Sequence, residues 1–283
     1  MKFALSTLGL PGTPVDDVLR LAADSGFDGV ELHSRPEGPV HPGTGTAERA
    51  RITARSAEAG LTVLSVAAPV RAAGGDEDGP VIEELGEAVR LAADLGAPYV
   101  RVLPGGGALP GNAFPGGGAP PAEEADVVAA RRLAAVAPEA ADRGVRILLE
   151  TRGSHPRGAD VARITGLVGH RAVGVVWDPA HTRHAGEEPH ETLPVLAPHL
   201  GYVRVKDSAP DGEAAAAGDA APPPGGAAVP PLRAAVRALR SHGYDGWLCW
   251  EHEQQWHADA PGPGPLAAAA RNRLAELADG PAA

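Results

Sequence analysis

Short apolar runs alternate with longer amphipathic stretches along the whole chain. Seven of these runs follow a glycine by one to three residues, and they lie in 25–32, 59–66, 95–103, 143–150, 172–178, 200–207 and 242–251. An eighth run, KFALST, begins at Lys2. Each run has the length and apolarity of a buried strand. The pattern predicts eight strands, seven of them preceded by a helix that ends at a glycine: Gly26, Gly60, Gly96, Gly144, Gly174, Gly201 and Gly243.

The stretches between the runs have the periodicity of amphipathic helices. In 14–25, for example, Val15, Val18, Leu19 and Ala22 fall at i, i+3, i+4 and i+7, which places them on one helix face. The same pattern recurs at 46–59, 80–95, 123–143, 158–168, 189–198, 229–242 and 265–279. Helices in these positions are the crossovers that consecutive parallel strands need.

Eight strand-and-helix units in 283 residues match a closed parallel barrel. The sequence therefore predicts an α/β fold, a single (β/α)8 TIM barrel domain over 1–283. An open doubly wound sheet is the alternative architecture. It is weakened by the count of eight strands and by the missing Gly-x-Gly-x-x-Gly turn after the first strand.

Composition narrows the class of protein. The 37 glycines and 29 prolines concentrate in 104–121 and 209–230, which we expect to be mobile loops, although drift in composition would also explain the alanine-rich part of the second. A formal net charge of −11 argues against non-specific binding to nucleic acid. The chain has no run of 18 apolar residues that could span a membrane, and its single cysteine, Cys249, excludes an internal disulfide. A cytoplasmic location fits these features.

Acidic residues stand at the ends of several predicted strands: Glu31, Glu150, Asp178, Asp207 and Glu251. Parallel barrels place their chemistry where the strands end. Three of these carboxylates, from the fifth, sixth and eighth strands, would repel one another at the same mouth. A divalent cation is the usual solution, and structural salt bridges are the alternative.

Five segments resemble the sugar phosphate isomerase/epimerase superfamily of xylose-isomerase-like barrels. They are FDGVELH (27–33), ILLE (147–150), WDPAH (177–181), VRVKDS (203–208) and GYDGWLCWEHE (243–253), and the resemblance covers nearly the whole chain. It implies a small sugar or polyol substrate and a possible homo-oligomer. The superfamily also includes dehydratases and, more distantly, apurinic endonucleases, against which the acidic balance of this chain counts.

The resemblance implies a divalent metal ion (Mn, Mg, Co or Zn) held by Glu150, Asp178 and Glu251. The fourth ligand of the family is a histidine, and Arg204 stands in its place. A guanidinium cannot coordinate a metal. Two outcomes follow: the carboxylates bind a metal with water or His181, or Arg204 itself supplies the positive charge in ion pairs with Glu150 or Glu251.

The activity expected from the resemblance is metal-assisted proton transfer through an enediolate of a keto sugar or polyol derivative. Glu150 and Glu251 are the predicted catalytic acid and base. The predicted substrate-binding residues are His181, Glu31, Arg204 and Arg101. A lyase or dehydratase that uses the same enolate is one alternative. A metal-free barrel that binds a sugar without catalysis is the other, because of Arg204.

Overall fold

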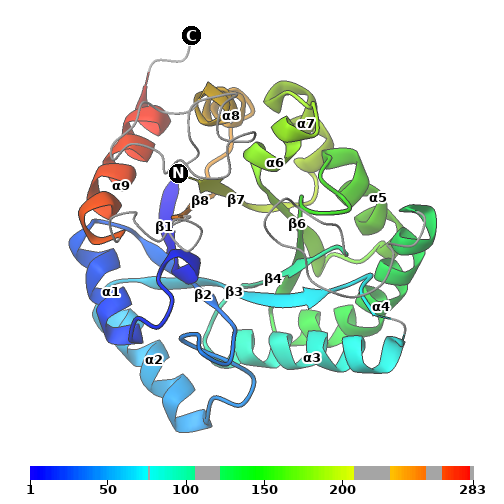
Figure 1. Cartoon of the computed structure of the whole chain (residues 1–283), viewed down its shortest axis with the longest axis horizontal. Helices are drawn as coiled ribbons and strands as arrows, with labels where there is room; N and C mark the ends of the chain where they lie inside the picture. The colour runs from blue at the N-terminus through cyan, green and yellow to red at the C-terminus, as the bar shows by residue number, and fades with distance from the viewer. Residues whose placement is uncertain (76, 106–121, 207–229, 253–262, 281–283) are drawn as a thin grey trace.

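Eight parallel strands close into a barrel in the order in which they occur in the chain (Figure 1). The computed structural model describes residues 1–75, 77–105, 122–206, 230–252 and 263–280. The strands are β1 (Lys2–Ser6), β2 (Gly29–His33), β3 (Thr62–Arg71), β4 (Tyr99–Leu103), β5 (Arg146–Glu150), β6 (Val173–Trp177), β7 (Leu200–Lys206) and β8 (Trp247–Glu251). β1 pairs with β8 through Lys2 and Trp247, which closes the ring. The predicted TIM barrel is confirmed.

Helices surround the strands on the outside of the ring (Figure 1). They are α1 (Val15–Asp24), α2 (Thr46–Glu58), α3 (Asp78–Asp94), α4 (Ala122–Asp142), α5 (Gly158–Val168), α6 (Pro179–His184), α7 (Pro189–Leu196), α8 (Pro230–Ser241) and α9 (Pro263–Asp279), with a 3-10 turn, η1 (Thr7–Gly9), after β1. Two helices, α6 and α7, fill the crossover from β6 to β7, where the sequence predicted one. No helix in the described part of the chain combines the length and apolarity that crossing a membrane requires.

Two of the predicted helix-ending glycines have a different role. Five of the seven do take the left-handed conformation that ends a helix, with φ between 68° and 79°: Gly26, Gly60, Gly96, Gly144 and Gly243. Gly174 and Gly201 instead lie inside β6 and β7. At Gly174 an added Cβ would stand 2.5 Å from the carbonyl oxygen of His199. The backbone just before β7 therefore comes so close that glycine is required there.

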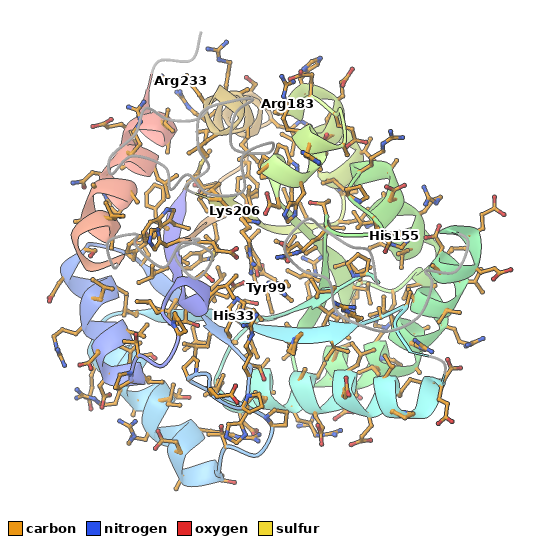
Figure 2. The ribbon with its side chains drawn as sticks, in the orientation of Figure 1. His33, Tyr99, His155, Arg183, Lys206 and Arg233 are labelled. Carbon is orange, nitrogen blue, oxygen red and sulfur yellow. The ribbon has the colours of Figure 1, made fainter. Side chains whose placement is uncertain are left out.

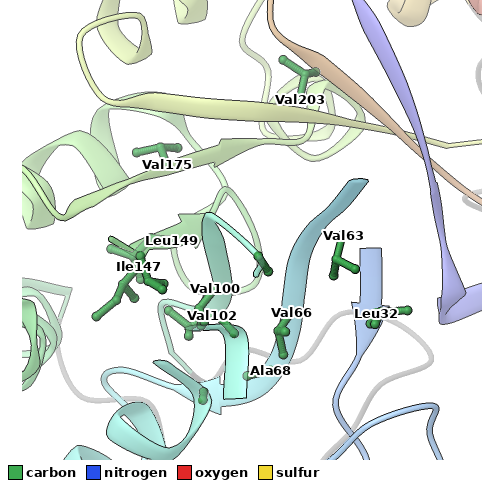
Figure 3. Close-up of a cluster of buried hydrophobic side chains, with 14 of the residues drawn as sticks. Leu32, Val63, Val66, Ala68, Val100, Val102, Ile147, Leu149, Val175 and Val203 are labelled. Carbon is green, nitrogen blue, oxygen red and sulfur yellow. The ribbon is translucent and has the colours of Figure 1, made fainter. Parts of the chain in front are cut away.

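The strands separate two apolar clusters. The outer core lies between strands and helices, and Figure 3 shows its strand residues, among them Leu32, Val66, Val100, Val102, Ile147, Leu149, Val175 and Val203. The inner core fills the barrel and consists of Ala4, Leu64, Leu148, Val176, Tyr202 and Cys249. Successive strand residues point to opposite sides. Leu148 therefore points inward between outward-pointing Ile147 and Leu149, and a side chain two positions further on also points inward.

The loops predicted at 104–121 and 209–230 lie almost wholly outside the described residues. Cys249 is fully buried in the inner core, where burial raises the pKa of its thiol well above the usual range. This environment agrees with a structural cysteine.

Gly174 provides a test of the barrel packing. Gly174→Ala should lower the free energy of unfolding by about 1–3 kcal/mol, because the new methyl group meets the backbone of His199 and the guanidinium of Arg146. Guanidinium chloride unfolding measures the change. Gly166→Ala on the exposed face of α5, where nothing lies within 4 Å, is the control and should raise stability by about 0.5–1 kcal/mol. Equal effects at the two sites would contradict the close packing of β6 against the start of β7.

Candidate functional site

Four carboxylates stand at the mouth of the barrel, directly above the inner core. These mouth carboxylates are Glu31, Glu150, Asp178 and Glu251, and each is at most 1% exposed. The strand alternation places them there: Glu150, for example, follows the inward-pointing Leu148 by two positions on β5. Buried carboxylates are costly unless positive groups pair with them.

Three buried positive side chains share this mouth with the carboxylates. These mouth cations are Arg101 on β4 and Arg204 and Lys206 on β7. Their side chains are 4%, 0% and 5% exposed, respectively. Figure 2 shows Lys206 inside the ring of strands, whereas Arg183 and Arg233 lie on the outer helices. The site is therefore a buried cluster of opposite charges.

Arg204 bridges two of the carboxylates. Its Nη2 lies 2.5 Å from Oε1 of Glu31, and its Nη1 lies 2.5 Å from Oε2 of Glu251. Glu150 is more distant, with Oε2 at 3.7 Å from Nη1. Burial alone would lower the pKa of Arg204, but Glu150, Glu31 and Glu251 outweigh it and hold this pKa well above the usual range. The guanidinium is therefore a permanent charge in the site.

Glu31 also accepts hydrogen bonds from two side-chain hydroxyl groups. Its Oε1 accepts a hydrogen bond from the Ser6 hydroxyl at 2.8 Å, and its Oε2 accepts a short hydrogen bond from the hydroxyl of Tyr202. Burial would raise the pKa of Glu31, yet Arg204 and Arg101 keep it below the ordinary value. Both oxygens are thus already occupied, which gives Glu31 the role of fixing Arg204.

Glu150 is paired by charge but not by hydrogen bonds. Nε of Arg101 lies 2.9 Å from its Oε2, and Nη1 of Arg152 lies 3.9 Å from its Oε1. Neither oxygen has a hydrogen-bond partner among the described residues. Burial would raise the pKa of Glu150, but Arg101, Arg204 and Arg152 together hold it well below its usual range. Glu150 is therefore an ionised carboxylate with unused acceptor capacity.

The two carboxylate oxygens of Asp178 have different partners and different roles. Oδ1 accepts from the backbone N–H of Ala180 at 2.9 Å and so caps α6, which begins with Pro179. Oδ2 faces the site, 3.2 Å from Nζ of Lys206 and 3.5 Å from Nδ1 of His181. Burial raises the pKa of Asp178, but His181 and Lys206 more than offset this, and the net pKa is lowered.

His181 uses both ring nitrogens within the site. Nδ1 lies 2.7 Å from the carbonyl oxygen of Thr151, and Nε2 lies 3.0 Å from Nζ of Lys206. A carbonyl can only accept and an ammonium can only donate, so the proton of a neutral ring is on Nδ1. Burial lowers the pKa of His181, and the raising effect of Asp178 does not overcome it.

A second polar chain braces the loop after β5. Nε2 of His155 lies 2.7 Å from Oδ1 of Asp126 on α4, and Nδ1 lies 2.8 Å from the hydroxyl of Ser154. The backbones of Arg152 and His155 exchange two hydrogen bonds of 3.1 Å. This brace fixes the segment that carries Thr151 and Arg152 to the mouth.

One group of side chains has the spacing of a metal site. Single ligand atoms of Glu150, Asp178 and His181 all lie within 4.8 Å of one another, so by distance these three could hold a metal ion. Both oxygens of Glu150 and Oδ2 of Asp178 have no hydrogen-bond partner among the described residues, which agrees with this. The remaining contacts do not: His181 donates through Nδ1, and Lys206 and Arg101 lie against the two carboxylates. Charge and protonation of the donors therefore do not fit a resident divalent ion.

All seven site residues named from the sequence come together at this mouth. They are Glu31, Arg101, Glu150, Asp178, His181, Arg204 and Glu251. The proposed metal set differs from the spatial group, which contains His181 instead of Glu251. Lys206 and Tyr202 also face this mouth but are not among the site residues named from the sequence. Both are two positions from Arg204 on β7, so strand alternation alone would have placed them inside the barrel.

Residues 19–277 match the family described as "Xylose isomerase-like TIM barrel". The chain belongs to this family. Among solved members of the same fold, L-ribulose 3-epimerase is 20% identical, with a TM-score of 0.78 over 98% of this chain and 94% of that one. D-psicose 3-epimerase, solved in the presence of D-fructose, is 16% identical, with a TM-score of 0.76 over 99% and 100%. The IolI protein with a bound zinc atom is 18% identical, with a TM-score of 0.75 over 98% of both chains. No curated protein matches the sequence.

Within the xylose isomerase-like barrel, the Tyr202–Glu31–Arg204 contacts should contribute measurably to stability. Tyr202→Phe should lower the free energy of unfolding by about 1.5–3 kcal/mol, because it removes a buried hydrogen bond to a charged acceptor. Tyr244→Phe is the matched control. It removes a hydrogen bond of 3.1 Å to the neutral carbonyl of Trp247 and should cost about 0.5–1.5 kcal/mol. Chemical denaturation in which Tyr202→Phe costs no more than Tyr244→Phe would contradict the role given to Glu31.

Proposed function

We propose that this chain is a sugar isomerase or epimerase that moves a proton on a keto sugar or polyol derivative through an enediolate. The observation that supports the proposal is the placement of two buried glutamates, Glu150 and Glu251, whose oxygens lie 3.7 Å and 2.5 Å from the same nitrogen, Nη1 of Arg204. Positive charge beside two carboxylates suits a reaction in which negative charge develops on a substrate oxygen. The sugar epimerases that share this fold agree with the substrate class.

In this proposal Glu150 removes the proton from the carbon next to the carbonyl group. Its lowered pKa keeps it ionised at neutral pH, so it is ready to accept a proton although it is a weak base. The electrons of the broken C–H bond move to the carbonyl oxygen. The resulting enediolate is stabilised by the cations around it, which lowers the barrier for an otherwise weak base.

Glu251 returns a proton to the opposite face of the enediolate. Solvent supplies this proton to Glu251, and Lys206, with Nζ at 3.8 Å from Oε1 of Glu251, keeps its positive charge beside the site. After the transfer Glu150 releases to solvent the proton that it accepted, so the protons balance. Return of a proton to the other face inverts the carbon, and return to the neighbouring carbon isomerises the sugar.

Several buried polar atoms in the site remain without hydrogen bonds among the described residues, and we assign them to the substrate. They are Nε of Arg101, Nε of Arg204, both carboxylate oxygens of Glu150 and Oδ2 of Asp178. Donors and acceptors in such proximity suit a ligand that carries a carbonyl and several hydroxyl groups. His181 acts by holding Lys206 through its Nε2, and Glu31 acts by holding Arg204.

The divalent metal expected from the resemblance has grounds for it and grounds against it. The bound zinc of the IolI structure is one ground for it, and the spacing of Glu150, Asp178 and His181 is another. A divalent ion polarises a carbonyl group when it is bound. The pairing of these residues with Lys206, Arg101 and Thr151 stands against it, so no step above uses a metal.

Exchange of carbon-bound protons tests the proposed function. The wild-type protein is incubated in D2O with D-fructose, D-allulose and L-ribulose, and deuterium incorporation is followed by NMR. Glu150→Gln and Glu251→Gln should each reduce the exchange rate by about 10²–10⁴-fold, since each removes a proton-transfer group. Glu58→Gln on the exposed surface of α2 is the matched control and should leave the rate unchanged.

Three outcomes would contradict the proposal. Full activity of either mouth variant would remove that glutamate from the reaction. Loss of water from the sugar in place of exchange would indicate a lyase. No exchange with any of the three ketoses would indicate a barrel without the proposed catalysis.

A further inference from the structure

We propose that the guanidinium of Arg204, with the ammonium of Lys206 beside it, occupies the cation position of this mouth and excludes a divalent metal ion from it. Two side chains of β7 then supply the positive charge that a metal ion would otherwise provide. Its catalytic part, stabilisation of an enediolate oxygen by Arg204 and Lys206, rests on the proposed function. Its structural part, exclusion of the metal, rests on the ion pairs alone.

Arg204 is fixed in the position that it occupies. Its two terminal nitrogens each lie 2.5 Å from a carboxylate oxygen, of Glu31 on one side and Glu251 on the other. Moving the guanidinium away would remove the ion pair of Glu31 and leave this buried carboxylate with hydrogen bonds from the hydroxyl groups of Ser6 and Tyr202. A buried charge that loses its partner strongly destabilises the folded protein. A metal ion that displaced Arg204 would have to overcome this cost.

The charges of the mouth are nearly balanced without a metal. Three mouth cations face the four mouth carboxylates, which leaves one formal negative charge. Arg152, with Nη1 at 3.9 Å from Glu150, offsets much of that charge from the rim. A divalent ion added to this set would turn a nearly neutral buried cluster into a positive one. Repulsion from Arg204 and Lys206 would then oppose binding.

In the group of Glu150, Asp178 and His181, the histidine also has no free nitrogen to bind a metal ion. Nδ1 of His181 carries a proton that it donates to Thr151, and Nε2 accepts from Lys206. Coordination needs a free nitrogen lone pair, so one of these two hydrogen bonds would have to break. Glu251, the other carboxylate expected as a ligand, is engaged by Arg204.

The same contacts give Arg204 a chemical role. Its Nε is buried and has no hydrogen-bond partner among the described residues, so one N–H remains for a substrate oxygen. A fixed guanidinium with a spare donor can stabilise a developing oxyanion without reorganisation. Nζ of Lys206 supplies a second positive charge near Asp178 and Glu251. The ligand class that follows is a ketose or a related polyol with a carbonyl oxygen to receive these charges.

Metal binding in solution tests the exclusion. The wild-type protein, purified from cells grown with added manganese, should contain far less than one equivalent of metal by plasma mass spectrometry. Calorimetric titration with MnCl2 should give no stoichiometric binding, and EDTA should leave the melting temperature unchanged. Arg204→His supplies the missing ligand and removes the charge. It should bind manganese at least about 100-fold more tightly than wild type, because loss of even an outer partner of a metal site costs about 10–100-fold.

Arg204→Lys is the matched control because it retains a positive charge and should remain free of metal. Circular dichroism establishes that the variants are folded, and the wild-type measurements decide the question if Arg204→His is not. Stoichiometric, chelator-sensitive metal in the wild type would overturn the proposal. So would folded Arg204→His that gains no affinity for manganese. None of these readouts uses activity, so a failure of ketose exchange would overturn the proposed function and leave the exclusion of the metal intact.

Discussion

The charge compensation of four buried carboxylates is the constraint on which this site depends. The barrel brings Glu31, Glu150, Asp178 and Glu251 to one mouth, where each is at most 1% exposed. Such a cluster is stable only if positive charge of similar magnitude is buried with it. Arg204 contributes most directly, because it contacts two of the carboxylates and lies near a third. The cations that make burial of the carboxylates possible are also groups that can stabilise an enediolate.

The fold positions these charges through the simple alternation of β-strands. On β5, β7 and β8 an inward-pointing residue of the inner core is followed two positions later by a charged residue of the mouth. The inner core thus forms an apolar floor beneath the site, and Tyr202 joins the two layers through its hydroxyl group. The outer core holds the strands against the helices (Figure 3). Strand geometry therefore connects packing and chemistry.

Much of this could be predicted from the sequence, and the exceptions have identifiable causes. The eight strands and the charged residues at their ends follow from local patterns. The sequence also shows that Arg204 stands where the resembling family has a histidine ligand. The partners of Arg204 do not follow from local patterns. Glu31 is 173 positions away, on a strand that is not adjacent to β7, so the pair depends on the closed register of the barrel. The sequence pattern predicts helix ends at Gly174 and Gly201, because sequence alone does not distinguish that role from close packing inside a strand.

A crystal structure of the wild-type protein grown with manganese, with anomalous diffraction data, tests the central claim most directly. Our account predicts the guanidinium of Arg204 between Glu31 and Glu251, with no anomalous peak among the carboxylates of the mouth. A manganese peak coordinated by Glu150 and Asp178, with Arg204 turned away from Glu31, would contradict it.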